Sequence, residues 1–240
     1  VVSRVVTGVR AVQEALRSRG TQIQALYIAE DARRALSQLA DEAARGGVRV
    51  ETKSPGELDA LAEGHKHQGV VAITGEFEYA DFDQLLAAEP RLLLALDQVT
   101  DPHNFGAIVR SAVAFGVDGI LTLKKRAAPV TPVVVRASAG ATEHARIAKV
   151  TNLARTLADL AKRDFQVVGL DAEGEHEIGQ LPPAPFGRVL VVGAEGKGLR
   201  RLVRERCTHL ARIPMGGPVA SLNASVAAAI ALYATLRTDG

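Results

Sequence analysis

Helical and strand-like patterns of apolar residues alternate at the start of the chain. Apolar side chains recur on one helical face in residues 9–16 and again in residues 36–43, and Ser54 followed by Pro55 is typical of the start of a third helix. Short apolar or alternating runs between these helices predict strands at 25–28, 48–50 and 69–74. The pattern therefore predicts a small αβ domain over residues 1–75.

Residues 76–90 lose this periodicity and carry five acidic side chains, which indicates a linker with a short helix at 82–87. Further apolar runs predict strands at 92–96, 119–123, 166–170, 189–192 and 210–213, and helical patterns fill 104–115, 151–163, 198–206 and 220–236. Apolar strands that alternate with helices are typical of a parallel sheet covered on both faces. Residues 91–240 are expected to form this second domain, with ligands bound at the carboxyl ends of its strands.

The composition narrows the class of protein without giving a function. With 47% hydrophobic residues and a net charge of +2, the chain is not a disordered one. Its single cysteine, Cys207, cannot form an internal disulfide or a cysteine-based zinc site. No apolar run approaches the ~18 residues that cross a bilayer, and the first residues do not have the order of a secretory signal. A soluble, cytoplasmic protein is expected.

The small excess of positive charge belongs to the second domain. Residues 1–80 hold ten basic and eleven acidic side chains, a balance of −1, whereas residues 81–240 hold nineteen and sixteen, a balance of +3. The positive charges of the second part gather at 124–126 and at 200–206. Each cluster is either a binding patch or an ordinary solvated surface, and the pattern leaves both open.

Two loops that follow predicted strands carry candidate chemistry. In the loop at 97–112, Asn104 is the expected N-cap of the next helix, and Arg110 lies about one and a half turns further on. The loop at 192–199 has three glycines around Glu195, and its spacing fits neither a Walker A loop nor a dinucleotide fingerprint. Taken singly, each is also compatible with a capped helix or a tight turn.

A third loop, at 213–228, passes through two glycines and a proline before a helix rich in small residues. Ser221 and Asn223 stand where the helix is expected to begin, and either a capping role or a role in a site fits such a serine. Other chemistry is not supported by the sequence. No Gly-x-Ser-x-Gly elbow is present, and His65 and His67 have no acidic or cysteine pattern that completes a metal site.

Taken together, the three loops resemble the three ordered motifs of the SpoU (TrmH) family of RNA ribose 2′-O-methyltransferases, which belong to the SPOUT class. The matching segments are DPHNFGAIVR at 101–110, GAEGKGL at 193–199, IPM at 213–215 and SLN at 221–223. The front of the chain extends the resemblance. TGVRAV at 7–12 and HQGV at 67–70 look like the substrate-binding domain of the RlmB type, which methylates a guanosine in 23S ribosomal RNA.

The resemblance implies a SPOUT-type parallel sheet with a carboxyl-terminal trefoil knot, preceded by a small αβ substrate-binding domain. It also implies S-adenosylmethionine as cofactor, no metal, and a homodimer whose site draws on both subunits. The positions that match the family's polar active-site residues are Asn104, Arg110, Glu195, Ser221 and Asn223. The positions that match its cofactor contacts are Gly193, Gly196, Ile213, Met215 and Leu222.

The resemblance also implies that RNA is the partner, bound through basic side chains. The candidates are Arg4, Arg10 and Lys66 in the first domain and Arg200, Arg201 and Arg204 in the second. Arginine keeps its proton above pH ~12, so Arg110 is interpreted as a group that holds the target phosphate, rather than as a general base. The favoured substrate is 23S ribosomal RNA. The alternatives are a transfer RNA enzyme, a resistance enzyme acting on ribosomal RNA, and an assembly factor without catalytic activity. The presence of all five matching polar residues argues against an inactive factor.

Overall fold

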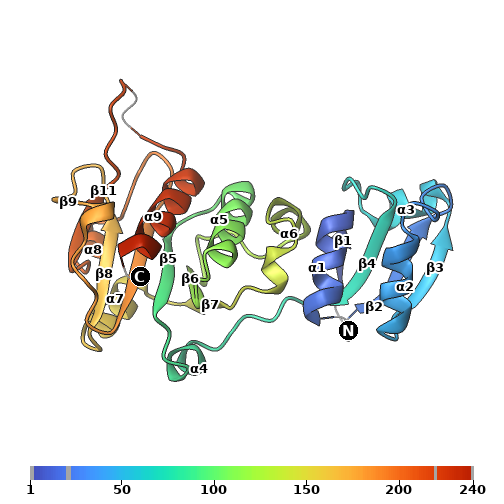
Figure 1. The fold of residues 1–240 in the computed structure, drawn as a ribbon, viewed down its shortest axis with the longest axis horizontal. Coiled ribbons are helices and arrows are strands. Elements are labelled where there is room, and N and C mark those ends of the chain that lie inside the picture. The colour runs from blue at the N-terminus through green and yellow to red at the C-terminus, as the bar shows by residue number, and fades with distance from the viewer. Residues whose placement is uncertain (1–2, 20–22, 219–220, 239–240) are drawn as a thin grey trace. The chain divides into compact units, whose positions relative to one another are not determined.

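The computed structural model describes residues 3–19, 23–218 and 221–238, which divide into two units. The first unit comprises Val1–Glu78 together with Val130–His144, and the second comprises Tyr79–Pro129 and Ala145–Gly240 (Figure 1). The sequence pattern predicted boundaries near residues 75 and 91 and a second domain without interruption. The structure differs in that Val130–His144 leaves the second unit and packs within the first.

The first unit is built on a four-stranded mixed sheet with the strand order β1-β4-β2-β3. The pairs β1–β4 and β4–β2 are antiparallel, and β2–β3 is parallel. Its elements are β1 (Ser3–Thr7), α1 (Val9–Arg19), β2 (Ile23–Ala29), α2 (Ser37–Arg45), β3 (Arg49–Lys53), α3 (Pro55–Leu61), β4 (Val70–Gly75), α6 (Pro132–Ala137) and the 3₁₀ helix η2 (Ala141–Glu143). The helices and strands predicted here are confirmed, whereas β1, α6 and η2 were not predicted.

Gln68 joins the two front segments that carry the family resemblance. Its side-chain Oε1 accepts a hydrogen bond of 3.3 Å from the backbone N–H of Val9, at the start of α1. Gly8, with a φ of +93°, donates its N–H to the carbonyl of Val70 at 3.4 Å. Residues 7–12 and 67–70 therefore meet at one end of the sheet, as a single local structure.

Arg4 is buried instead of lying on an RNA-binding surface. The residue is 9% exposed, and its guanidinium Nη2 lies 2.9 Å from a carboxylate oxygen of Glu143, which is 4% exposed. Its Nε donates to the hydroxyl of Thr74 at 3.3 Å. The expectation that Arg4 belongs to a surface patch is wrong, because its charge pairs inside the unit. Arg10 and Lys66 are exposed and stay candidates.

The second unit is built on a seven-stranded sheet with the order β7-β6-β5-β10-β8-β11-β9, and its neighbouring strands are parallel. Its elements are α4 (Phe82–Ala87), β5 (Leu92–Asp97), α5 (Pro102–Ala114), β6 (Gly119–Leu123), β7 (Ile147–Val150), α7 (Leu153–Ala161), β8 (Phe165–Leu170), β9 (His176–Glu177), η3 (Ile178–Gln180), β10 (Gly187–Gly193), α8 (Arg201–Arg204), β11 (His209–Arg212) and α9 (Ala224–Thr238). The predicted α/β class with a parallel sheet is confirmed. The short elements β7, β9 and η3 were not predicted, and α8 is shorter than the helix expected at 198–206.

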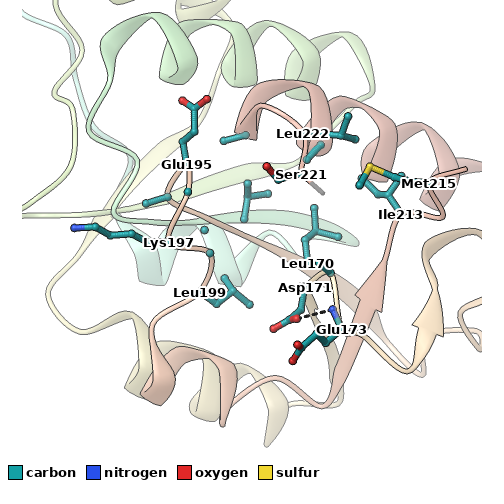
Figure 2. A pocket seen from close by; sticks show the side chains of 18 residues that line it. Leu170, Asp171, Glu173, Glu195, Lys197, Leu199, Ile213, Met215, Ser221 and Leu222 are labelled. Atoms are coloured by element: carbon teal, nitrogen blue, oxygen red, sulfur yellow. Dashed lines mark hydrogen bonds between the residues drawn. The ribbon is translucent and has the colours of Figure 1, made fainter. Parts of the chain in front are cut away.

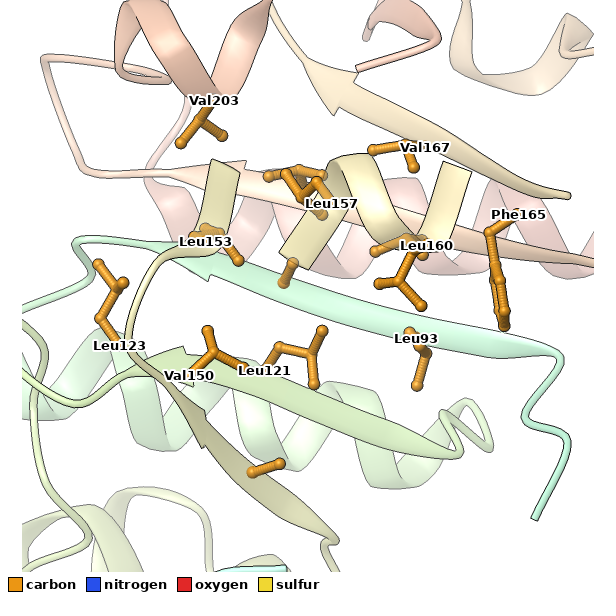
Figure 3. Packing of buried hydrophobic residues seen from close by; sticks show 14 of the residues in the cluster. Leu93, Leu121, Leu123, Val150, Leu153, Leu157, Leu160, Phe165, Val167 and Val203 are labelled. Carbon is orange, nitrogen blue, oxygen red and sulfur yellow. The ribbon is translucent and has the colours of Figure 1, made fainter. Parts of the chain in front are cut away.

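Helices cover the central strands, which are buried at every position of β5 and β10. On one face, Leu153, Leu157 and Leu160 recur on one side of α7 and pack with Leu93 and Leu121 of the sheet (Figure 3). Elsewhere α9 packs against both α5 and β10. Burial on both faces explains why these strands are apolar throughout rather than alternating. Among the described residues, no helix is long and apolar enough to span a membrane.

Candidate active site

The three loops singled out in the sequence meet at the carboxyl edge of the second sheet. Gly193 at the end of β10 pairs in register with Asp97 at the end of β5, so the first two loops leave the sheet side by side. β11, which is separated from β10 by β8 and runs parallel to both, brings the third loop to the same edge. A cavity of about 440 Å³ opens there (Figure 2). This is the position at which parallel sheets bind ligands.

The walls of this cavity contain every residue that was expected to contact a cofactor: Gly193, Gly196, Ile213, Met215 and Leu222. Ser221 and Glu195 line it as well. One further wall was not among the predicted site residues; it is formed by Leu170, Asp171, Ala172 and Glu173. This wall could have been predicted from the sequence. Residues 166–170 were expected to form a strand, and the residues that follow the carboxyl end of a parallel strand lie at the ligand-binding edge of the sheet.

The glycine loop turns back tightly on itself. Any side chain on Gly193 would overlap the backbone carbonyl of Gly198, which explains the glycine there. Gly196 and Gly198 have φ angles of +72° and +61°, a region that favours glycine, and the N–H of Gly198 donates to the Ala194 carbonyl at 2.9 Å. The turn brings backbone close to the cavity and sends the side chains of Glu195 and Lys197 in different directions (Figure 2).

One polar side chain from each loop joins a hydrogen-bonded cluster. The Asn104 amide Nδ2 donates to Glu195 Oε2 at 3.0 Å, and the Asn223 amide Nδ2 donates to Asn104 Oδ1 at 2.9 Å. A longer contact of 3.4 Å joins Asn223 Nδ2 to Glu195 Oε1. Ser225 fixes the other end of Asn223, because its N–H and hydroxyl both donate to Oδ1, at 2.9 and 2.6 Å. Three of the predicted catalytic residues therefore meet, and we call Asn104, Glu195 and Asn223 the polar triad.

Asp101, and not Asn104, caps α5. The Asp101 carboxylate accepts the backbone N–H of Asn104 at 2.8 Å, and Pro102 occupies the first helical position. The expectation that Asn104 is the N-cap is wrong by three residues. The correction matters for the site, because capping by Asp101 leaves the Asn104 amide available to the polar triad.

Ser221 and Arg110 stand apart from the polar triad. Ser221 lines the cavity, and no hydrogen bond to its side chain is found within the described part of the chain. Arg110 is exposed on α5, six residues beyond Asn104. In an α-helix that separation amounts to about 9 Å along the axis and about 120° around it. Among the described residues, Arg110 forms no hydrogen bond or ion pair with the other predicted catalytic residues, and it does not line the cavity.

The basic residues at 200–206 are largely paired with carboxylates. Asp97, which is fully buried, accepts the Arg200 backbone N–H at 2.9 Å and its Nε at 2.7 Å. Arg204 Nε donates to Asp171 at 2.7 Å, and Arg201 pairs with Glu205 on the exposed side of α8. Arg200 and Arg204 therefore have carboxylate partners within the protein, and a role of Arg200, Arg201 and Arg204 in RNA binding stays a prediction.

Asp171 is an ionised group in the cavity wall. Partial burial raises the pKa of this carboxyl, but the hydrogen bonds from Arg204 and from the Glu173 backbone N–H outweigh that effect. Its pKa consequently lies below the ordinary value, and the carboxylate is charged at neutral pH.

Cys207 is a structural thiol. Burial raises its pKa to about 12, and Sγ donates to the Val203 carbonyl at 3.4 Å. Because the thiolate is the reactive form, we expect iodoacetamide at pH 8 to alkylate Cys207 at least about tenfold more slowly in the folded protein than in urea. Mass spectrometry of timed samples measures both rates, and equal rates would contradict this assignment.

Comparison with known proteins shows which family the chain belongs to. Residues 91–233 match the SpoU rRNA Methylase family, and residues 5–80 match the family described as RNA 2′-O ribose methyltransferase substrate binding. The chain belongs to the SpoU rRNA methylase family. It is 42% identical over 242 residues to YacO of Bacillus subtilis, whose name assigns it to the TrmH family of tRNA/rRNA methyltransferases, with 97% of this chain and 94% of YacO covered.

The chain is also similar to a further relative and to two solved structures. An "Uncharacterized tRNA/rRNA methyltransferase" of Mycolicibacterium vanbaalenii is 44% identical over 238 residues, covering 96% of this chain and 75% of that protein. The structure of the SpoU methyltransferase AviRb from Streptomyces viridochromogenes with AdoMet has a TM-score of 0.79 and 28% identity, covering 98% of this chain and 89% of that one. An AdoMet-bound rRNA methyltransferase from Sinorhizobium meliloti also has a TM-score of 0.79, at 26% identity and 98% and 87% coverage. SpoU methyltransferases of this fold therefore bind AdoMet (S-adenosylmethionine).

Proposed function

We propose that this SpoU family member transfers a methyl group from AdoMet to a ribose 2′-hydroxyl of RNA. The observation that carries the proposal is the polar triad of Asn104, Glu195 and Asn223, which adjoins the 440 Å³ cavity. The match of residues 5–80 to a substrate-binding family of RNA 2′-O ribose methyltransferases supports it from an independent part of the chain. Because the fold alone does not fix chemistry, the proposal rests on these groups.

The residues around the larger cavity suit AdoMet. Ile213, Met215 and Leu222 supply apolar contacts for a flat base, and the tight turn at Gly193 places backbone groups within reach of a ligand. Asp171, whose carboxylate pairs with Arg204, lines another wall of the same cavity. When bound, AdoMet supplies an electrophilic methyl group on its sulfonium.

The chain's own residues would orient the acceptor hydroxyl and receive its hydrogen bond. Glu195 is held by amide donors from two other loops, so its carboxylate has a fixed position at the cavity edge. A carboxylate placed there can accept a hydrogen bond from a ribose hydroxyl, while the Asn104 and Asn223 amides fix the geometry. Alignment of the hydroxyl with the methyl group would contribute a large part of the rate. Ser221 lies on the cofactor side of this arrangement.

A homodimer is part of the proposal. Val226, Ile230 and Tyr233 recur on one face of α9 and are 46%, 37% and 53% exposed, an apolar stripe that a second subunit would cover. α5 packs against α9, and the rings of Phe115 and Tyr233 lie 6.2 Å apart, so a subunit seated on this stripe lies next to the helix that carries Arg110. We therefore place Arg110 in the partner's site, where its guanidinium would hold the phosphate beside the target ribose.

Mixed dimers test this assignment. Arg110→Ala and Asn104→Ala chains are each expected to be inactive, but refolding them together in equal amounts should restore about a quarter of wild-type activity, since half of the dimers then contain one complete site. Activity and oligomeric state are measured on the same mixtures. A mixture of dimers as inactive as its parents would show that Arg110 does not act across subunits.

For the substrate, we propose a guanosine of 23S ribosomal RNA, on the resemblance of residues 7–12 and 67–70 to the RlmB type. The trefoil knot of the SPOUT class belongs to the same proposal, and the strand order β5-β10-β8-β11 at the site supports it. The test is transfer from labelled AdoMet to ribosomal RNA and transfer RNA separately, with the product mapped by mass spectrometry. Labelling of transfer RNA instead would identify transfer RNA as the substrate. AdoMet binding without labelling of either RNA would favour an RNA-binding factor without catalytic activity.

A further inference from the structure

A second cavity of about 340 Å³ adjoins the first within the same unit. Ala194, Glu195, Lys197 and Ala224 line both cavities, so the glycine loop and the start of α9 form a shared wall. The remaining walls of the second cavity come from the first loop and from the turn after β6: Gln98, Val99, Thr100, Asp101, Asn104 and Arg126. None of the residues predicted to contact the cofactor lines this second space.

The second cavity carries two cations without carboxylate partners. Arg126 and Lys197 are exposed, and across the described residues neither takes part in an ion pair or a side-chain hydrogen bond. They differ in this from Arg200 and Arg204, whose charges are neutralised by Asp97 and Asp171. A cation without a protein partner at a cavity rim is free to bind an anionic ligand.

The backbone of this cavity has an unusual conformation at two positions. Gln98 and Arg126 have φ angles of +61° and +62°, which non-glycine residues seldom adopt. Gln98 follows β5, and Arg126 follows β6. A hydrogen bond of 3.0 Å from the Ala128 N–H to the Val99 carbonyl ties the two turns together. Such conformations persist where the surrounding structure enforces them, and they are concentrated at ligand sites.

We propose that the second cavity receives the acceptor nucleotide, with Arg126 and Lys197 binding the phosphates on either side of it. The inference rests on the proposed function, because the polar triad would then lie between cofactor and acceptor, with Asn104 and Glu195 reaching the ribose. Gln98 and Thr100 also line this space, and an amide and a hydroxyl are groups that can form hydrogen bonds with a base. A single nucleotide in such a pocket has to leave its base stack, as in other enzymes that modify RNA within loops.

Arg126 is the decisive residue, since it lines the second cavity only, whereas Lys197 lines both. Arg126→Ala should lower kcat/KM for ribosomal RNA by about tenfold or more, the effect of one charge-assisted hydrogen bond. It should also reduce the slope of log affinity against log salt by about one. The affinity for AdoMet, measured by calorimetry, should stay within about twofold of wild type. Arg126→Lys should recover much of the binding but less of the turnover, because lysine lacks the bidentate fork.

Arg163→Ala is the matched control. Arg163 is an exposed arginine beyond the end of α7 that lines neither cavity, so its removal should leave both the rate and the salt slope unchanged. If Arg126→Ala folds, methylates RNA as well as wild type and keeps the wild-type salt slope, the inference is overturned while the proposed function stands.

Binding of guanosine 5′-monophosphate to the AdoMet-loaded protein separates the two proposals. The inference expects saturable binding by wild type that Arg126→Ala weakens and Arg163→Ala does not. If wild type methylates no RNA but shows this pattern, the proposed function fails and the nucleotide site stands. Binding that is insensitive to Arg126 would place the nucleotide elsewhere.

Discussion

Asn104→Ala is expected to lower the single-turnover rate of methyl transfer by about a hundredfold or more, the usual cost of losing one positioned polar group next to reacting atoms. The amide of Asn104 donates to Glu195 and accepts from Asn223, so it is the central member of the polar triad. Without it, both neighbours lose a partner and the carboxylate of Glu195 loses its fixed position. The affinity for AdoMet should change little, because Asn104 does not line the larger cavity.

Two further variants sharpen this measurement. Asn104→Asp keeps the size of the side chain but replaces the donor with a carboxylate 3.0 Å from Glu195, so it should be at least as damaging as alanine. His103→Ala is the control, because His103 is the exposed neighbour on the same helix and has no side-chain bond within the described residues. A wild-type rate for Asn104→Ala would remove the polar triad from the chemistry.

Arg200→Ala is expected to destabilise the second unit by about 2–3 kcal/mol, because it leaves a buried carboxylate without its cation. Asp97 is fully buried at the end of β5, and Arg200 supplies both a backbone N–H and a guanidinium to it. The backbone donor survives the substitution, which limits the loss. Urea unfolding followed by circular dichroism measures the change in the free energy of unfolding.

Arg201→Ala is the matched comparison for Arg200. Its guanidinium is 80% exposed and pairs with Glu205 one turn away, so its loss should cost less than about 0.5 kcal/mol. If Arg200→Ala is as stable as Arg201→Ala but binds RNA much more weakly, then Arg200 is a surface binding residue after all and the structural role given to it is wrong.

The strands and loops around the site were predictable because their signals are local. A strand buried on both faces, such as β5, has an unbroken apolar run, and the glycines of 193–198 mark a turn in the sequence itself. The helix α6 was missed for a local reason too. Its sequence, PVVVRA, contains three consecutive β-branched valines, which favour extended structure, and the helix depends on the Thr131 cap and Pro132 at its start.

The partners of charged residues were not predictable, because they come from far along the chain. Arg4 pairs with Glu143, and Arg200 with Asp97, a separation of about a hundred residues or more in each case. The N-cap of α5 could have been placed correctly, since Pro102 at the first helical position points to Asp101. The three-loop pattern placed Glu195 and Asn223 at one sheet edge, whereas the position of Arg110 relative to them follows only from helix geometry.

The most direct test of a ribose 2′-hydroxyl as the acceptor uses an RNA altered at one atom. Once the methylated nucleotide is mapped, the same RNA is synthesised with a 2′-deoxy residue at that position only, and transfer from labelled AdoMet is measured with equal RNA binding verified. The account predicts that the deoxy RNA binds with nearly unchanged affinity and accepts no methyl group. Continued methylation at that nucleotide would show that the enzyme modifies the base, and would contradict the proposed function.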